Sequence, residues 1–492
     1  MKNYNFVLIF WMAVGLLTAC APDLPRNQFY VDALRGNDHF SGHSPDAAWK
    51  SLDAVNVHRF HSGDRLFFKA GTSYTGQLVL HGSGSADAPV KISRYGSGKD
   101  PLIQGNGQKN YTLLLRNVSY YEVRHLKITN HGDSRKPNRT GVLLEADNYG
   151  DMTHIVLDSL EVADVNGSLV KKKGGGSAIF WRNHGDSVLS RFVDLKIEYC
   201  YLHDCGRNGI GSTGNAGRDR WFPSKKVLID HNLLERIPGD GIVPIGCDSA
   251  IIEYNTMRLC PDSLSPDEAA AGIWPWSSDH TLIQFNEVSG HKAKWDGQGF
   301  DADYNCFGTV LRYNYSHDNY GGFLLVCNDG SSLGKPWNHG TRNSRICFNL
   351  SVNDGIRPYP TRQEGWFAPV FHLTGPSENT LIQHNLIVIP QRKMEEDKPV
   401  VVAMGNWGNQ WPRTMKILGN TICSVQQPIY WWKKASSFSF KKNDEKILTH
   451  YSASVVIEQL DRLIQQSDSA DREGYRRLKQ FVLPRLRGQV IN

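Results

Sequence analysis

The sequence lacks the features that mark several large classes of protein. Its nine cysteines include no C-x-x-C pair, so the spacing typical of structural zinc sites is absent. The formal net charge is only +6 over 492 residues, and the basic residues are scattered among acidic ones, which does not indicate nucleic-acid binding. Beyond the first twenty residues, no apolar run is long enough to cross a membrane as a helix. The sequence therefore disfavours zinc proteins, nucleic-acid-binding proteins and multi-span membrane proteins.

The first twenty residues have the pattern of an export signal. Lys2 precedes a short apolar run from Phe6 to Leu17, and small residues lead to Cys20. This pattern resembles a bacterial lipoprotein signal, which implies cleavage before Cys20 and attachment of a lipid to that cysteine. We expect an exported protein of the bacterial cell envelope, held at the membrane only by this anchor. The alternative is an ordinary secretory signal with an incidental cysteine.

The other eight cysteines carry little functional information. Cys200 takes the place of an asparagine in the repeat described next, and Cys347 lies beside a core isoleucine. Both positions are typical of small buried apolar residues. Because an exported protein can form disulfides, a bridge such as Cys200–Cys205 is the alternative.

A short sequence motif recurs seven times, in which an aliphatic residue stands three positions before an asparagine. The asparagines are 23 to 36 residues apart, which is too irregular for leucine-rich or ankyrin repeats but natural for coils joined by loops of variable length. Asparagine tolerates the left-handed backbone of a tight bend, and its amide can bond to the same amide in the next coil. We therefore predict a solenoid with an internal asparagine ladder. The pairs are Ile229/Asn232, Ile252/Asn255, Ile283/Asn286, Leu311/Asn314, Ile346/Asn349, Ile382/Asn385 and Ile417/Asn420.

The N-terminal part of the chain carries a more specific resemblance. Tyr30-Val31-Asp32, Gly36-Asn37-Asp38, Ser44-Pro45, and Gly63-Asp64 with Leu66 resemble the opening of secreted proteins of the pectate-lyase-like superfamily. The resemblance continues through the asparagine ladder to about residue 430. It implies an all-β fold, the right-handed parallel β-helix, and an activity on carbohydrate.

The expected organisation has four parts. Residues 1–20 are the signal, 21–105 a tether and N-terminal cap region, 106–435 the parallel β-helix, and 436–492 a short helical tail. A brief helix is expected near Ser51 to Val55. We expect the tail to pack on or near the last coil and protect an open sheet end. The protein is expected to be a monomer.

A second strand follows each ladder position and often begins with glycine. Aligning Gly241-Ile242, Gly272-Ile273, Gly299-Phe300 and Gly322-Phe323 predicts which side chains face outward, because alternate residues of a strand point to opposite sides. This alignment places two tryptophans beside two carboxylates, the combination that a sugar site requires. The predicted outward residues are Val243 and Ile245, Trp274 and Trp276, Asp301 and Asp303, and Leu324 and Val326.

The segment from Trp295 to Asp303 is the main catalytic candidate. Asp301 and Asp303 lie about 6.6 Å apart along a strand, which leaves open both the retaining and the inverting mechanism of glycoside hydrolysis. Asp296 is a possible third acid, and Asp240 is interpreted as a turn residue. Trp274, Trp276, Trp295 and Arg312 are the expected substrate-binding residues.

A calcium site is the alternative for this acidic segment. Oxygen ligands from Asp296, Asp301 and Asp303 would suit Ca²⁺. In the polysaccharide lyases that this protein resembles, such a metal helps to neutralise a uronate while a base removes a proton. Lys292, Lys294 and Arg312 are candidates for that base. The sequence lacks the paired arginine motif of lyases and the combined Asn-Thr-Asp, Asp-Asp and Gly-His-Gly set of polygalacturonases. A charged outer face without catalysis is a further alternative.

Several other residues are weaker candidates. His203-Asp204 and His317-Asp318 occupy equivalent positions in two coils, which favours a turn role, although His317 follows the acidic strand and is kept as a catalytic candidate. Lys171 to Lys173 is interpreted as a solvated loop or as a contact for an anionic glycan. Four aromatic residues on later coils are candidates for the extension of a groove: Trp366, His372, Trp407 and Trp411.

The sequence as a whole predicts an exported enzyme that acts on a glycan. The resemblance to β-helix glycoside hydrolases favours hydrolysis of glycosidic bonds by paired carboxylates, without a cofactor. A calcium-dependent lyase acting on a uronate glycan and a non-catalytic glycan-binding lipoprotein are the alternatives, because a fold does not determine a function.

Overall fold

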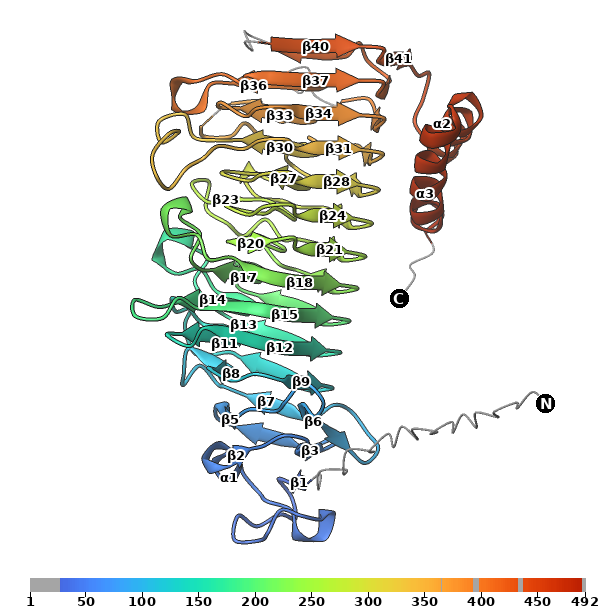
Figure 1. Cartoon of the computed structure of the whole chain (residues 1–492). Helices are drawn as coiled ribbons and strands as arrows, with labels where there is room; N and C mark the ends of the chain where they lie inside the picture. Colours follow the sequence, from blue (N-terminus) through green and yellow to red (C-terminus); the bar gives the residue numbers. More distant parts are fainter. Residues whose placement is uncertain (1–26, 364, 393–397, 432–436, 489–492) are drawn as a thin grey trace, which may run out of the picture.

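The computed structural model describes residues 27–363, 365–392, 398–431 and 437–488. The expected signal and its lipidation residue Cys20 lie outside these residues. The described chain forms one elongated stack of coils, with a pair of helices lying along its side (Figure 1). None of the helices in this part of the chain combines the length and the apolar character needed to cross a membrane.

Parallel sheets run the length of the stack, so the predicted parallel β-helix is confirmed. The long sheet has fifteen strands, and a second sheet has thirteen. The strands of the long sheet are β1 (Gln28–Val31), β3 (Arg65–Lys69), β6 (Val90–Tyr95), β9 (Tyr121–Arg124), β12 (Asp151–Asp158), β15 (Arg191–Glu198), β18 (Ser224–Asp230), β20 (Cys247–Asp248), β21 (Ile251–Glu253), β24 (Leu282–Gln284), β28 (Val310–Arg312), β31 (Arg345–Cys347), β34 (Thr380–Gln383), β37 (Thr414–Leu418) and β40 (Ser437–Lys441). The thirteen-stranded sheet contains β4 (Ser73–Thr75), β7 (Leu102–Gln104), β10 (Lys127–Asn130), β13 (Glu161–Val165), β16 (Tyr201–Cys205), β19 (Leu233–Glu235), β22 (Thr256–Arg258), β25 (Glu287–Ser289), β29 (Tyr315–His317), β32 (Leu350–Val352), β35 (Leu386–Ile389), β38 (Thr421–Ser424) and β41 (Asp444–Ile447).

The third side of the coils is split into two sheets, which isolated bridges through Ile242 and Ile273 connect. The five-stranded part, here called the site sheet, contains β27 (Phe300–Ala302), β30 (Leu324–Cys327), β33 (Phe371–Thr374), β36 (Val400–Gly405) and β39 (Ile429–Trp431). The six-stranded part contains β2 (Arg59–Phe60), β5 (Leu78–Gly82), β8 (Tyr111–Arg116), β11 (Thr140–Asp147), β14 (Ser177–His184) and β17 (Asn208–Thr213), and a separate pair is formed by β23 (Ala269–Ala270) and β26 (Trp295–Asp296). The helical elements are η1 (Pro45–Ala47), α1 (Leu52–Val57), η2 (Lys171–Lys173), η3 (Arg218–Arg220), η4 (Trp407–Asn409), α2 (Ala453–Gln466) and α3 (Ser469–Leu486).

The coils extend beyond the boundaries expected from the sequence. Parallel pairing already begins within residues 21–105, where β1 pairs with β3 and β4 pairs with β7. It continues past residue 435 through β40 and β41, and the helical tail starts only at Ala453. The short helix predicted near Ser51 is α1, whose N-terminus is capped by the Ser51 side chain.

The predicted asparagine ladder is present inside the stack. Each asparagine from Asn232 to Asn420 is at most 2% exposed, and its amide donates to the side-chain oxygen of the next one at 2.9–3.1 Å. The ladder continues to Asn443, which the repeat search missed. At the other end, Cys200 replaces asparagine, and its backbone N–H donates to Asn232. The ladder therefore supplies buried backbone groups with partners in every coil that it crosses.

The left-handed bend lies one residue before each asparagine, and not at the asparagine as predicted. Tyr254, Phe285 and Tyr313, for example, have φ of 55°, 54° and 58°. Their side chains point outward and stack from coil to coil, with ring centroids 4.8–5.9 Å apart and interplanar angles of 9–23°. We call this set the aromatic column: Tyr199, His231, Tyr254, Phe285, Tyr313, Phe348 and His384.

The C-terminal helices lie along the side of the stack, against the outer face of the thirteen-stranded sheet and the later rings of the aromatic column. They reach the last coil where Lys446 of β41 donates to Gln459 of α2, so the expected contact with the last coil is present, but most of the helical pair lies beside earlier coils. Figure 1 shows α2 and α3 lying along the side of the stack. Phe481 of α3 makes edge contacts with Tyr254 and Phe285, and Tyr475 makes one with Phe348. Apolar residues of both helices also cluster with Leu350, Val352, Leu386 and Val388 of the thirteen-stranded sheet, so burial of apolar surface on the sheet and on the rings holds the helical pair in place.

The eight cysteines of the described chain are free thiols, and all but Cys347 are buried. The interpretation as small buried apolar residues is therefore confirmed for Cys200 but not for Cys347, which lies in register with Arg312 and Gln383, and the Cys200–Cys205 bridge is not formed.

Candidate active site

A cavity of about 600 Å³ lies over the outer face of the site sheet, with walls from the loops that precede it. Five of the residues predicted for the site line this cavity together: Asp296, Asp301, Asp303, Trp274 and Trp295. They come together because Ile273 bridges to Phe300, which sets Trp274 beside Asp301 in neighbouring coils. The other wall is built from later coils by Leu325, Cys327, Phe367, His372, Thr374, Met404, Gly405, Asn406 and Trp407.

Three of the predicted site residues lie elsewhere. His317 is on β29 in the thirteen-stranded sheet, where its ring nitrogens bridge Asp318 and Glu287 at 2.7 and 3.1 Å. Arg312 is on β28 of the long sheet and donates to Gln284 at 2.8 Å. Trp276 is close to the site, but its ring stacks on Tyr304 at 5.3 Å and does not line the cavity.

The register of β30 differs by one residue from the predicted alignment. The backbone N–H groups of Phe323 and Leu324 both donate to the carbonyl of Val370, at 3.0 and 2.9 Å. This extra residue is a bulge, which the spacing of glycines in the sequence did not reveal. Leu324 and Val326, which were predicted to face outward, are fully buried in the core, and Leu325 and Cys327 face the cavity instead.

Asp301 is a buried carboxyl group that favours its neutral form. Its exposed fraction is 3%, and its Oδ1 atom has no hydrogen-bond partner among the described residues. Burial raises the pKa of Asp301 well above its usual value, and the charges of Asp303 and Asp296 raise it further. The cavity therefore holds a carboxyl group whose surroundings favour the protonated form, beside other acids.

Asp303 is held as an acceptor. Burial also raises the pKa of Asp303, but hydrogen bonds from the Cys327 thiol and the Tyr304 N–H act in the opposite direction. Both donors contact Oδ1, at 2.6 and 2.5 Å. These two donors favour the ionised form and fix the orientation of the carboxylate. The pKa of Asp303 is still raised overall, so the two acids of one strand differ in their hydrogen-bond partners and not in the direction of the shift.

Asp240 belongs to the site and is not only a turn residue. Burial alone would raise the pKa of Asp240, but the cations of Lys171 and Arg207 lower it to about 2. The Asp240 carboxylate accepts from the Trp274 indole at 3.3 Å, and Lys171 lies 3.4 Å from it. The fully buried Arg207 also contacts Glu268. Asp240 therefore holds Trp274 in position.

Lys171 covers part of the predicted stacking surface. Its ammonium group lies 4.7 Å from the centre of the Trp274 ring. A sugar that stacks on this face has to displace the lysine or contact it. The short η2 helix, which was interpreted as a solvated loop, thus supplies one residue to the cavity.

His372 and Trp407 both line the cavity. The sequence identified them as candidates but did not indicate to which side their side chains point. Burial lowers the pKa of His372 to about 4, so its imidazole is neutral near pH 7. Trp366 and Trp411 do not line it. Among the described residues, no three His, Cys, Asp or Glu side chains are arranged to hold a metal ion, and this includes the alternative calcium set of Asp296, Asp301 and Asp303.

The fold and the comparisons define this protein as a right-handed parallel β-helix protein. A family model described as "Right handed beta helix region" matches residues 177–344. The chain is similar to lacto-N-biosidase of Bifidobacterium longum subsp. longum, with 27% identity over 434 residues, covering 68% of this chain and 26% of the relative. It is also similar to alpha-1,3-galactosidase A of Akkermansia muciniphila, with 30% identity over 183 residues, covering 34% of this chain and 30% of the relative.

A solved structure has the same fold. The crystal structure of GH136 lacto-N-biosidase from Eubacterium ramulus superposes with a TM-score of 0.62 and 22% identity, covering 86% of this chain and 68% of that chain. The chain spans less than a third of the length of the two curated relatives.

Proposed function

We propose that this protein is a glycoside hydrolase that acts on an oligosaccharide in the cavity above the site sheet. The observation that carries the proposal is the pairing of a neutral carboxyl group, Asp301, with an oriented carboxylate, Asp303, in one cavity lined by tryptophans. Hydrolysis of a glycosidic bond needs one carboxyl group that gives a proton and one that attacks or activates water. The similarity to two named glycosidases supports this class of reaction.

In the proposed reaction, Asp303 is the charged partner. A proton passes from a neutral carboxyl group to the glycosidic oxygen, and the bond from that oxygen to the anomeric carbon breaks. Asp303 either attacks the anomeric carbon or takes a proton from the water that does so. The pKa of Asp301 is raised well above its usual value, while Asp296 is the more exposed of the two remaining acids. Both are therefore tested as the proton donor.

The aromatic and basic residues of the cavity have the role of binding the sugar. Trp295 and Trp407 present ring surface on which the C–H groups of a pyranose can stack. Lys171 and the neutral His372 offer hydrogen-bond donors to sugar hydroxyls. Trp274 is held by Asp240, so its replacement by alanine should mainly weaken binding.

A substrate screen with product analysis by mass tests the proposal. Oligosaccharides that carry lacto-N-biose or α-1,3-linked galactose should be examined first, because the names of the relatives suggest them, followed by neutral and uronate glycans. A product mass that corresponds to the addition of water supports hydrolysis. A product that lacks this water and absorbs as an unsaturated uronate means elimination, and binding without any product means a non-catalytic protein.

Single variants assign the roles. Asp303→Asn should lower turnover by at least about 10²-fold, the usual scale for such assistance, while Asp186→Asn on an exposed loop is the matched control. Loss of the proton donor should lower turnover much less on an aryl glycoside than on the oligosaccharide, because the aryl leaving group needs no protonation. Comparison of Asp301→Asn with Asp296→Asn on both substrates therefore identifies the donor. Near-normal turnover in all three variants would exclude this site.

We also propose that the protein is exported and anchored at the cell envelope through a lipid on Cys20. The apolar run from Phe6 to Leu17 and the small residues before Cys20 support this. Cys20→Ser should move the protein from the membrane fraction to the soluble fraction without loss of folding. A native protein that is already soluble would contradict the anchor.

A further inference from the structure

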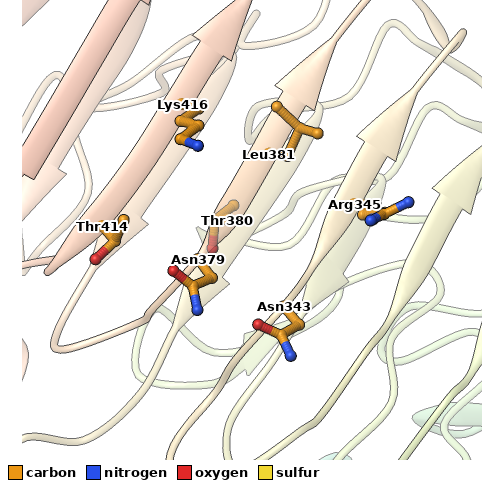
Figure 2. Close-up of a pocket in the computed structure, with 7 residues that line it drawn as sticks. All are labelled: Asn343, Arg345, Asn379, Thr380, Leu381, Thr414 and Lys416. Atoms are coloured by element: carbon orange, nitrogen blue, oxygen red, sulfur yellow. The ribbon is translucent and has the colours of Figure 1, made fainter.

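A second cavity, of about 380 Å³, lies on the outer face of the long sheet, away from the acids of the candidate active site. Its residues come from β31, β34 and β37 and from the bends that precede these strands. Figure 2 shows Arg345 and Lys416 on the two outer strands, with Leu381 on the strand between them. Asn343, Asn379 and Thr414 form a row beside them.

The two cations of this cavity have no acidic partner. Arg345 and Lys416 are both exposed, and neither is within 4.0 Å of a carboxylate of the described chain. Both are in register with Leu381, so they lie two strands apart, at about 9.6 Å. Both side chains are thus free to contact an anion from solvent. At this spacing they could contact the same small ion only if both side chains folded across Leu381.

Charge on the long sheet is separated along the stack. In one outward row, the earlier coils carry four acids in register, Asp158, Glu198, Asp230 and Glu253. From Arg312 onward, the same row and the one that contains Arg345 hold no carboxylate in the described strands. The later residues of these rows include Arg312, Arg345, Lys416 and Lys441. The last coils of these two rows therefore carry cations without carboxylates, whereas the earlier coils carry both acids and bases, such as Arg124 and Lys196.

The other lining residues suit hydroxyl groups. Asn343 and Asn379 are exposed bend residues with φ of 58° and 52°, and their side-chain amides make no hydrogen bond within the described chain. An amide both donates and accepts, as a sugar hydroxyl does. Leu381 between the cations offers an apolar floor for the C–H face of a ring. Cations, free amides and an apolar floor together match a chain that carries both hydroxyl and anionic groups.

We propose that this face binds an anionic glycan, one that carries carboxylate or sulfate groups, at a site separate from the cavity with Asp301 and Asp303. The two sites lie on the same coils, because β36 and β37 are joined by the segment that contains Trp407. The surface would hold a charged polysaccharide on a different face of the same coils as the cavity with Asp301 and Asp303. This inference does not depend on the proposed hydrolysis, since binding is measured without turnover.

Binding of defined polymers to the full chain tests the proposal. Polygalacturonate, dextran sulfate and neutral dextran are compared by affinity electrophoresis and by calorimetry. Binding to the first or to the second polymer, but not to dextran, supports the site and distinguishes carboxylate from sulfate. Arg345→Gln with Lys416→Gln should weaken this binding at least tenfold, with an unchanged melting temperature as the check on folding.

Two further variants separate a built site from general charge. Lys225→Gln with Lys226→Gln removes the same charge from exposed residues of an earlier coil and should leave binding unchanged. Asn379→Asp keeps a residue type that tolerates the left-handed bend but adds a carboxylate, and it should weaken binding. The inference is overturned if the native protein binds no anionic glycan, if the control pair weakens binding as much, or if DNA binds equally well.

Discussion

The Cys327 thiol donates a hydrogen bond to the carboxylate of Asp303, with Sγ 2.6 Å from Oδ1. Cys327 reaches this position only because of the bulge at Phe323, which turns alternate residues of β30 toward the cavity. Burial raises the pKa of the thiol itself well above its usual value, and the charge of Asp303 adds to this effect. Cys327 is therefore a hydrogen-bond donor and not a nucleophile.

Removal of this donor should change the pH dependence of the reaction. The hydrogen bond from Cys327 acts to lower the pKa of Asp303, so Cys327→Ala should move the acid limb of the kcat/KM profile to higher pH. Cys327→Ser keeps a donor and should stay close to the native profile. Equal profiles for the native protein and the alanine variant would show that the thiol does not act on this acid.

Removal of metal ions should leave activity unchanged. The proposed reaction uses carboxyl groups alone, so extensive dialysis against EDTA should not alter turnover on the best substrate. Loss of activity that added Ca²⁺ restores would move the assignment to the lyase alternative, and the product should then be unsaturated. Magnesium serves as the matched control ion.

The ladder should make a measurable contribution to stability. Asn314 is fully buried, donates to Ile283 and Asn349, and accepts from Asn286. Asn314→Ala should destabilise the protein by on the order of 1–3 kcal/mol, because buried polar groups lose their partners. Asn443→Ala, at the partly exposed end of the ladder, should cost less. Chemical denaturation measures the free energy of unfolding of both variants. Denaturation midpoints equal to that of the native protein would contradict an internal role for the ladder.

His317 should make stability depend on pH. Burial lowers its pKa, but hydrogen bonds to Asp318 and Glu287 outweigh burial and raise it from 6.5 to about 9. A group with a raised folded-state pKa contributes stability that is fully present below pH 6.5 and is lost as the pH rises through about 9. The native protein should therefore melt above His317→Gln at pH 6, and the difference should shrink at pH 9.5. A constant difference would exclude this linkage.

The repeating parts of the molecule were predictable, because the same spacing of residue types recurs in each coil. The phrase of an aliphatic residue and an asparagine identified seven ladder positions, and the parallel sheets follow from it. Alternation along one strand then placed Asp301, Asp303 and Trp274 in one cavity. Each of these predictions depends on local spacing in the sequence.

The parts that depend on non-local contacts were not predictable in this way. A single extra residue at Phe323 turned Cys327 toward Asp303. No residue type in this segment predicts such a bulge. Asp240 stands in a glycine-rich turn, and only its contact with Lys171 reveals its place in the site. The position of α3 depends on the aromatic column, whose rings stand 23 to 36 residues apart in sequence and become neighbours only when the coils stack.

The asparagine ladder keeps the distance between coils constant while the number of residues in each coil varies. Its members are spaced 23 to 36 residues apart, yet the bonds between them stay within 2.9–3.1 Å. Insertions in the loops of one corner therefore leave the coil-to-coil distance unchanged. Such a frame allows new loops to be grafted around the cavity to alter which sugar enters, while the carboxyl groups of β27 keep their positions.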